Sequence, residues 1–284
     1  MRKIEKPNNN IAEILDNAIK HLNSPRKEHI ENARGIIEEK TNEYDVLGQR
    51  GELHTIQIHN NVEELADKED MEALYTQKMV PKDSPNRYIY DSIMFLAPFQ
   101  KCPYCQQNLV KTLDHYLPKS KFVTYSVSPY NLVPSCTDCN VDKRAKTYDK
   151  SETQLFHPYY DDFDDTVWLK AIIVEKIPIS FQFYADPESS VPEEKAKRII
   201  HSFSPDGYNL NEIYTLHSAE KFYECFPRIQ ELFRKGGRQL AEERLNEYIE
   251  DATNISNNSW QAAMYRAMIE SDWFWNVYIV GNFY

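Results

Sequence analysis

Four of the five cysteines form two C-x-x-C pairs, Cys102/Cys105 and Cys136/Cys139. Two such pairs supply four thiolates, which suits a tetrahedral zinc ion closed on all sides. The 30 residues between the pairs exceed the usual zinc-ribbon interval, so a structure of its own must lie between them. A redox C-x-x-C motif and unrelated buried thiols are the alternatives. We expect a structural zinc ion that stabilises this proline-rich segment.

The residues around and between these pairs include the types that hydrolyse phosphodiester bonds. Asp114 and His115 stand in TLDHYLPKSKF, Asn131 in SPYNLVPSC and Asn140 in CNVDKRAK. Histidine can accept a proton near neutral pH. Asp and Asn are hard oxygen ligands that suit Mg²⁺ or Mn²⁺, and such an ion stabilises the leaving oxygen. Taken singly, a His-Asp pair is usually solvated surface, and an Asn is an ordinary turn or helix-cap residue, so only the combination is specific.

The order of these residues resembles an HNH endonuclease of the HNN variety, which ends in Cys-x-x-Cys-Asn-x-x-Lys. The resemblance implies a β-hairpin followed by a helix, with a catalytic metal ion between them. It implies that His115 is the general base, that Asp114 and Asn140 bind the catalytic divalent cation, and that Asn131 braces the loop that aims the imidazole. Neighbouring residues of a strand point to opposite faces, so a bulge or a strand end is expected at Asp114-His115.

A longer string, LDHYLPKSKF followed by P-x-N-L-V-P-x-C-x-x-C-N, resembles a narrower family. This family is the HNH nuclease subunit of Septu-type antiphage defence systems, which also accompanies some retrons (the PtuB-like group). The match covers residues 102–146, and Val123 stands where a proline is expected. The resemblance implies a partner, an SMC-like ATPase that restrains or directs the nuclease.

The charge distribution is uneven. The net charge is −11, yet residues 101–150 carry 8 Lys/Arg and 4 Asp/Glu. A small positive segment on an acidic chain favours focused contact with a nucleic-acid backbone rather than a broad coating surface. Lys143 and Lys146 lie three residues apart on the expected closing helix and therefore share a face. We predict that they contact substrate phosphates; the alternative is a solvated helix surface.

The rest of the chain must position this segment. We predict an α+β fold that is mainly helical, with a central zinc-stapled ββα-metal module. The predicted regions are a helical N-terminal region (1–98), the nuclease module (99–150), and a short hairpin with a helical C-terminal region (151–284). Apolar spacing predicts helices near 11–22, from 25 into the forties, 62–79, 86–97 and from about 192 onward, and strands at 167–175 and 178–185.

The function expected from the sequence is metal-dependent hydrolysis of nucleic acid, in a bacterial defence complex. We take DNA as the expected substrate, with low sequence specificity because no helix-turn-helix or other reading head is evident. No apolar run approaches the roughly 18 residues that span a bilayer, and the N-terminus lacks the apolar core of a secretory signal, so we expect a cytoplasmic protein. Two alternatives stay open: an HNH nuclease of a restriction or toxin system, and a non-catalytic zinc module that binds nucleic acid or protein.

Overall fold

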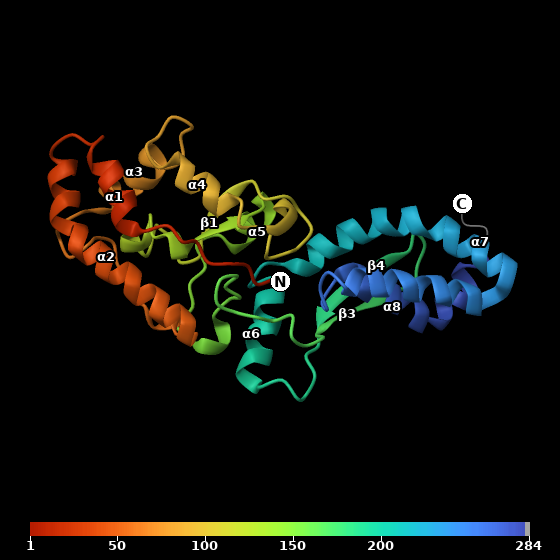
Figure 1. Ribbon diagram of the computed structural model, residues 1–284. Coiled ribbons are helices and arrows are strands. Elements are labelled where there is room, and N and C mark those ends of the chain that lie inside the picture. Colours follow the sequence, from red (N-terminus) through yellow and green to blue (C-terminus); the bar gives the residue numbers. More distant parts are fainter. Residues whose placement is uncertain (282–284) are drawn as a thin grey trace. The chain divides into compact units, whose positions relative to one another are not determined.

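The computed structural model describes residues 1–281 and divides the chain into two compact units, Met1–Asp162 and Phe163–Tyr284. Each unit combines helices with one small antiparallel sheet, which confirms a mainly helical α+β chain (Figure 1). Within residues 1–281, no helix is both long enough and apolar enough to cross a membrane.

The three regions predicted from the sequence map onto these units unequally. The regions predicted for residues 1–98 and 99–150 both lie in the first unit. The region predicted for 151–284 begins shortly before the second unit. The helices of the first region and the segment of the second also share one hydrophobic core, which includes Leu113 and Leu132.

The N-terminal half of the first unit is helical where the apolar spacing predicts it. The first helix begins after Asn10, whose side chain accepts a hydrogen bond from the backbone N–H of Ala12. The second ends at Gly51, whose φ of 73° is the left-handed conformation that glycine adopts without strain. The third begins with a capping box between Asp67 and Asp70. The helices are α1 (Ile11–Ile19), α2 (Arg26–Arg50), α3 (Lys68–Lys78) and α4 (Arg87–Met94).

The segment between the cysteine pairs forms a two-stranded sheet. Strand β1 (Thr112–His115) pairs antiparallel with β2 (Leu132–Ser135), in a continuous register with His115 opposite Leu132. Two short 3₁₀ turns lie in the connection between the strands. Helix α5 (Thr137–Lys143) follows β2 at once, and Cys136 caps it by accepting from the backbone N–H of Cys139. The local order is therefore strand, strand, helix.

The second unit contains the predicted hairpin and the C-terminal helices. Strands β3 (Leu169–Val174) and β4 (Ser180–Ala185) alternate buried and exposed residues, as the sequence predicts for a half-buried hairpin. Within this unit α8 (Trp260–Glu270) packs against β3, and α7 (Leu210–Thr253) packs against β4. The backbone of α7 leaves helical geometry at Gly236 and Gly237. The helices are α6 (Glu193–Phe203), α7 (Leu210–Thr253) and α8 (Trp260–Glu270), with a π turn at Phe274–Tyr278.

Candidate functional site

The four cysteines of the two C-x-x-C pairs converge on one point of the first unit. Their Sγ atoms all lie within 4.8 Å of one another and are buried, so the group could hold a metal ion such as zinc. Backbone N–H groups donate to two of the sulfurs: Asn108 to Cys105 and Cys139 to Cys136, each at 3.4 Å. Burial disfavours the thiolate at Cys102, but hydrogen bonds from the other three thiols hold its pKa well below the ordinary value. Hydrogen bonds with Cys102 and Cys136 raise the pKa values of Cys105 and Cys139 well above the ordinary value, so further thiolates in the cluster require a cation beside them.

Asp114 lies in β1 with its carboxylate buried on the side of the cysteine cluster. Asp114 is only 2% exposed. Oδ2 accepts a hydrogen bond from the Tyr104 hydroxyl at 2.9 Å, and Oδ1 accepts from the Lys143 ammonium at 2.9 Å. Each carboxylate oxygen has two acceptor positions, so both oxygens retain capacity for a further ligand.

Lys143 does not lie where a phosphate contact was predicted. The residue is fully buried, at 0% exposure, and its ammonium also donates to the His115 carbonyl oxygen at 2.7 Å. Lysine is rarely buried unless it is paired, and here Asp114 is its partner. Helix α5 ends at Lys143 because Arg144 adopts a positive φ of 50°, so Lys146 lies beyond the helix and shares no helical face with Lys143. The phosphate prediction for Lys143 is therefore wrong for this conformation.

His115 is the last residue of β1, so the dipeptide lies at a strand end, one of the two geometries expected. Its Nε2 lies 2.9 Å from the carbonyl oxygen of Ser126. Its ring meets the Tyr75 ring edge-on, with centroids 4.4 Å apart. Because a carbonyl oxygen can only accept, Nε2 carries the proton and Nδ1 of the neutral ring carries the lone pair.

The surroundings of His115 favour the neutral ring. The residue is 9% exposed. Burial lowers the pKa of His115 to about 3, against a weaker opposite effect of the hydrogen bond to Ser126. The ring is therefore neutral at pH 7, with Nδ1 unprotonated and less basic than in an exposed imidazole.

Asn131 closes the connection between β1 and β2. Its Oδ1 accepts from the Leu117 N–H at 2.7 Å and from the Tyr44 hydroxyl at 3.1 Å. Its Nδ2 donates to the carbonyl oxygens of Leu117 at 2.9 Å and Tyr125 at 3.2 Å. These four bonds use the full capacity of the amide. Asn131 thus fixes both ends of the segment from Leu117 to Tyr125. The next residue, Ser126, accepts the hydrogen bond from the His115 ring.

A directional chain of hydrogen bonds reaches Asn131 from the first unit's core. The Tyr159 N–H donates to His157 Nδ1 at 3.2 Å, so His157 Nε2 carries the proton and faces the Tyr44 oxygen at 3.2 Å. Tyr44, on α2, then donates to Asn131. Neither Tyr44 nor His157 was singled out from the sequence, since nothing in their spacing links them to residue 131.

Asn140 lies on α5, three residues before Lys143. The two residues therefore share a helix face, and Lys143 contacts Asp114. Within residues 1–281 the Asn140 side chain makes no hydrogen bond, although it is only partly exposed. Within the described residues, the links between Asp114, His115 and Asn131 are indirect. Lys143 connects the Asp114 carboxylate to the His115 carbonyl oxygen, and Asn131 acts on the His115 ring through the segment that leads to Ser126. The Asn140 amide contacts none of the three.

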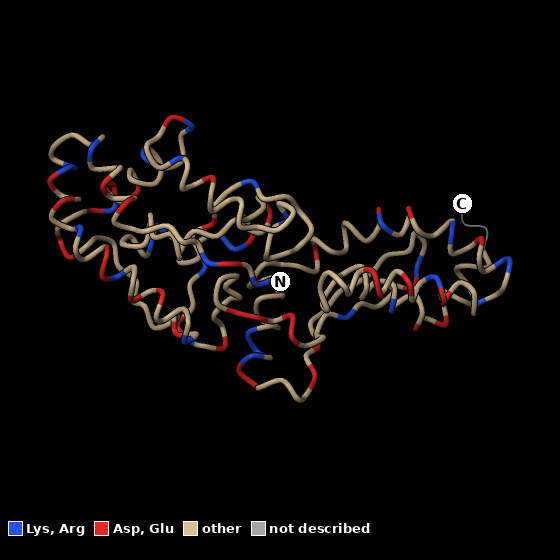
Figure 2. The backbone as a smooth tube through the Cα atoms, in the orientation of Figure 1, with Lys and Arg blue, Asp and Glu red and all other residues tan. Residues whose placement is uncertain are grey.

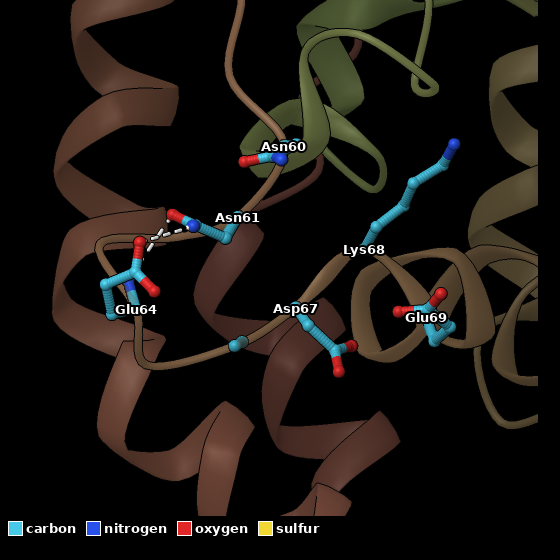
Figure 3. A pocket seen from close by; sticks show the side chains of 7 residues that line it. Asn60, Asn61, Glu64, Asp67, Lys68 and Glu69 are labelled. Atoms are coloured by element: carbon cyan, nitrogen blue, oxygen red, sulfur yellow. Dashed lines mark hydrogen bonds between the residues drawn. The ribbon is translucent and has the colours of Figure 1, made fainter.

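A surface hollow on the first unit contains none of the predicted site residues. It lies beside the start of α3 and is mainly polar (Figure 3). Its polar groups serve local structure: Asn61 donates to Glu64 at 2.6 Å, and Asp67 caps α3. We assign the hollow no role in the site. It is lined by Asn60, Asn61, Glu64, Ala66, Asp67, Lys68 and Glu69.

Comparison with known proteins adds one relative. The chain is 27% identical over 254 residues to "Protein ea31" of Escherichia phage lambda, which covers 82% of this chain and 85% of that protein. No protein-family model matches the chain. No solved structure matches it either.

Proposed function

We propose that this chain is a metal-dependent HNH-type endonuclease that hydrolyses phosphodiester bonds of nucleic acid. The observation that carries the proposal is the fixed ring of His115. Its Nε2–H is committed to the Ser126 carbonyl at 2.9 Å, which leaves Nδ1 as the proton acceptor. A base held in one tautomer at a strand end, beside a carboxylate, is what activation of a water molecule requires.

The roles of the other residues follow from their chemistry. Asp114 and Asn140 would hold Mg²⁺ or Mn²⁺, because both present hard oxygen ligands and both retain acceptor capacity. The bound cation would supply charge neutralisation at the phosphate and at the leaving oxygen. His115 would take the proton of the attacking water at Nδ1. Asn131 would keep the imidazole aimed by holding the segment that precedes Ser126.

The proposal also includes a structural metal ion, which the four cysteines would bind. We infer that they bind zinc, because four buried thiolates form a closed site with no position left for a substrate. The thiolates come from two knuckles, the C-x-x-C turns at 102–105 and 136–139. The zinc ion would link the segment before β1 to α5. Catalysis would take place at the Asp114-His115 end of β1.

The resemblance over residues 102–146 extends the proposal to a biological setting. We propose that the nuclease serves antiphage defence with an SMC-like ATPase as its partner. DNA is the substrate that we propose, with low sequence specificity. A restriction or toxin nuclease would have the same site without that partner.

One observation favours a second candidate function, a non-catalytic zinc module. Asp114 and Lys143 form a buried ion pair at 2.9 Å, an arrangement that can serve architecture alone. In such a module the site would bind no catalytic cation.

Plasmid nicking separates the two candidates. The purified chain should relax supercoiled DNA in the presence of Mn²⁺ or Mg²⁺ and lose this activity with EDTA. His115→Ala should lower the rate by about 100-fold or more, with unchanged circular dichroism and thiolate-bound metal. The matched control is His21→Ala on the surface of the same unit, which should leave the rate unchanged. Equal rates for His115→Ala and the wild type would exclude the nuclease proposal.

A further inference from the structure

Two buried side chains contact the Asp114 carboxylate. One comes from the first C-x-x-C pair, and the other comes from the helix that carries the second pair. Tyr104 lies inside the first C-x-x-C pair and donates its hydroxyl to Oδ2 at 2.9 Å. Lys143 lies four residues after the last cysteine, on α5, and its ammonium contacts Oδ1 at 2.9 Å. The carboxylate is therefore clamped between the two knuckles.

Burial makes these contacts strong. Tyr104 and Lys143 are both fully buried, so water does not compete for their hydrogen bonds. Both bonds involve a charged partner, which makes them stronger than bonds between neutral groups. The position of the Asp114 carboxylate thus depends on where the two knuckles lie.

We propose that Tyr104 is a positioning residue, through which the four-thiolate site sets the Asp114 carboxylate for a divalent cation. The inference rests on the proposed function, in which Asp114 is a ligand of that cation. It adds a dependence between the two proposed metal sites. The ion held by the thiolates would fix the first C-x-x-C turn and with it Tyr104. Tyr104 would then orient the carboxylate oxygen of Asp114. Partners that orient a metal ligand affect metal affinity strongly when they are removed.

The test is Tyr104→Phe, which deletes one hydroxyl and leaves the ring in place. Mn²⁺ binding, measured by electron paramagnetic resonance on the full chain, should weaken by about 10-fold or more. The content of thiolate-bound metal should stay unchanged. The matched control is Tyr159→Phe, a buried tyrosine of the same unit whose hydroxyl donates to the Leu132 carbonyl at 2.5 Å. It should bind Mn²⁺ as the wild type does.

A second measurement needs no catalytic metal. Tyr104→Phe, Asp114→Asn and the double variant should show non-additive shifts of the melting temperature, the double variant losing less than the sum, because the two groups contact each other. Additive shifts would overturn the inference.

The outcomes also separate this inference from the proposed function. Mn²⁺ binding that is identical in the wild type and in Asp114→Ala would overturn both. Binding that is lost in Asp114→Ala but unchanged in Tyr104→Phe would overturn the positioning role of Tyr104 alone.

Discussion

At the scale of single residues, the candidate site is held together by buried polar side chains that each form several hydrogen bonds. Asn131 makes four hydrogen bonds with its amide, and Asp114 receives a hydroxyl and an ammonium. A buried donor or acceptor that loses its partner costs more than the bond itself contributed. Small changes at these positions should therefore have large effects on stability.

Asn131→Ala tests this expectation. The substitution removes four hydrogen bonds and leaves the Leu117 N–H buried without its acceptor. The free energy of unfolding should fall by about 2–4 kcal/mol. Tyr44→Phe removes only one of the four bonds and should cost about 1 kcal/mol. Urea denaturation of both variants gives the comparison, and similar small losses in the two would contradict the bracing role of Asn131.

At the scale of elements, α3 carries a carboxylate that makes its anchorage depend on pH. Asp70 accepts from His29 Nδ1 at 2.7 Å and from Arg26 Nε at 3.0 Å, both on α2. Burial raises the pKa of Asp70, but these hydrogen bonds outweigh it and the pKa lies below its ordinary value. The same helix carries Tyr75, whose ring packs on His115.

The sign of the pH effect follows from that lowered pKa. A carboxyl whose pKa is lower in the folded state contributes stability above its unfolded pKa of about 3.9, and this contribution is lost as the pH falls through the folded pKa. Asp70→Asn should therefore cost about 1–2 kcal/mol at pH 7 and progressively less below about pH 4. Urea midpoints at pH 7 and pH 3 measure the difference. A cost that does not shrink in acid would contradict the ion-pair explanation.

Two glycines of α2 allow a matched test of how closely this helix packs against its surroundings. A Cβ added at Gly48 would overlap the ring of Tyr160, whereas one at Gly35 would meet nothing within 4 Å. Gly48→Ala should destabilise the protein by about 1–2 kcal/mol, since overpacking exceeds the gain in helix propensity. Gly35→Ala should stabilise it by about 0.5–1 kcal/mol. Thermal unfolding of the two variants should shift in opposite directions, and equal shifts would contradict this packing.

The elements were largely predictable from the sequence, and the contacts within the site only in part. Apolar spacing predicted the helices and the β3–β4 hairpin, because the helical and the strand periodicity are both visible in the sequence. Residues 53–59 alternate in polarity as a strand would, yet they form a 3₁₀ turn at Leu53–Thr55 and one isolated bridge at His59. Short apolar alternation does not decide between these structures.

The convergence of the four thiols was predictable from spacing, but the partners of Asp114 were not. A lysine is expected at the surface, and only the fold shows that Lys143 reaches a buried carboxylate. Tyr104 carries no signal beyond its place between two cysteines. The catalytic roles of Asp114, His115, Asn131 and Asn140 stay predictions.

At the scale of the whole chain, Lys and Arg are interspersed with Asp and Glu along the backbone (Figure 2). Many of these residues pair within one helix. On α7, for example, Arg228 pairs with Glu231 and Arg238 with Glu242. Beside the candidate site, Arg144 is exposed and follows the buried Lys143 directly. A nucleic acid bound there would meet this arginine on a chain whose net charge is −11.

This distribution of charge predicts that nucleic acid binds weakly and in a salt-sensitive way, with Arg144 as a phosphate contact. Each phosphate contact adds about 0.9 to the slope of log K against log salt for duplex DNA. Arg144→Ala should reduce the slope by about 1 and weaken binding alike for all sequences. Arg234→Ala, an exposed arginine on α7, is the control and should change neither quantity. Fluorescence anisotropy of labelled DNA with a catalytically inactive His115→Ala chain provides the measurement, and equal slopes for both variants would exclude Arg144 as a phosphate contact.

The two units differ in what removal of a metal should do to them. All four clustered cysteines lie in the first unit, and the second unit has a core of its own around β3, β4, α7 and α8. A structural zinc ion contributes its binding free energy directly to folding, on the order of 10 kcal/mol for small zinc sites. Calorimetry with a strong chelator should therefore lower the melting temperature of one transition by about 10 °C or more and leave a second transition in place. Cys225→Ser, which changes the one cysteine outside the cluster, should not alter the response to chelator. A chelator that shifts both transitions equally, or neither, would contradict a structural metal confined to the first unit.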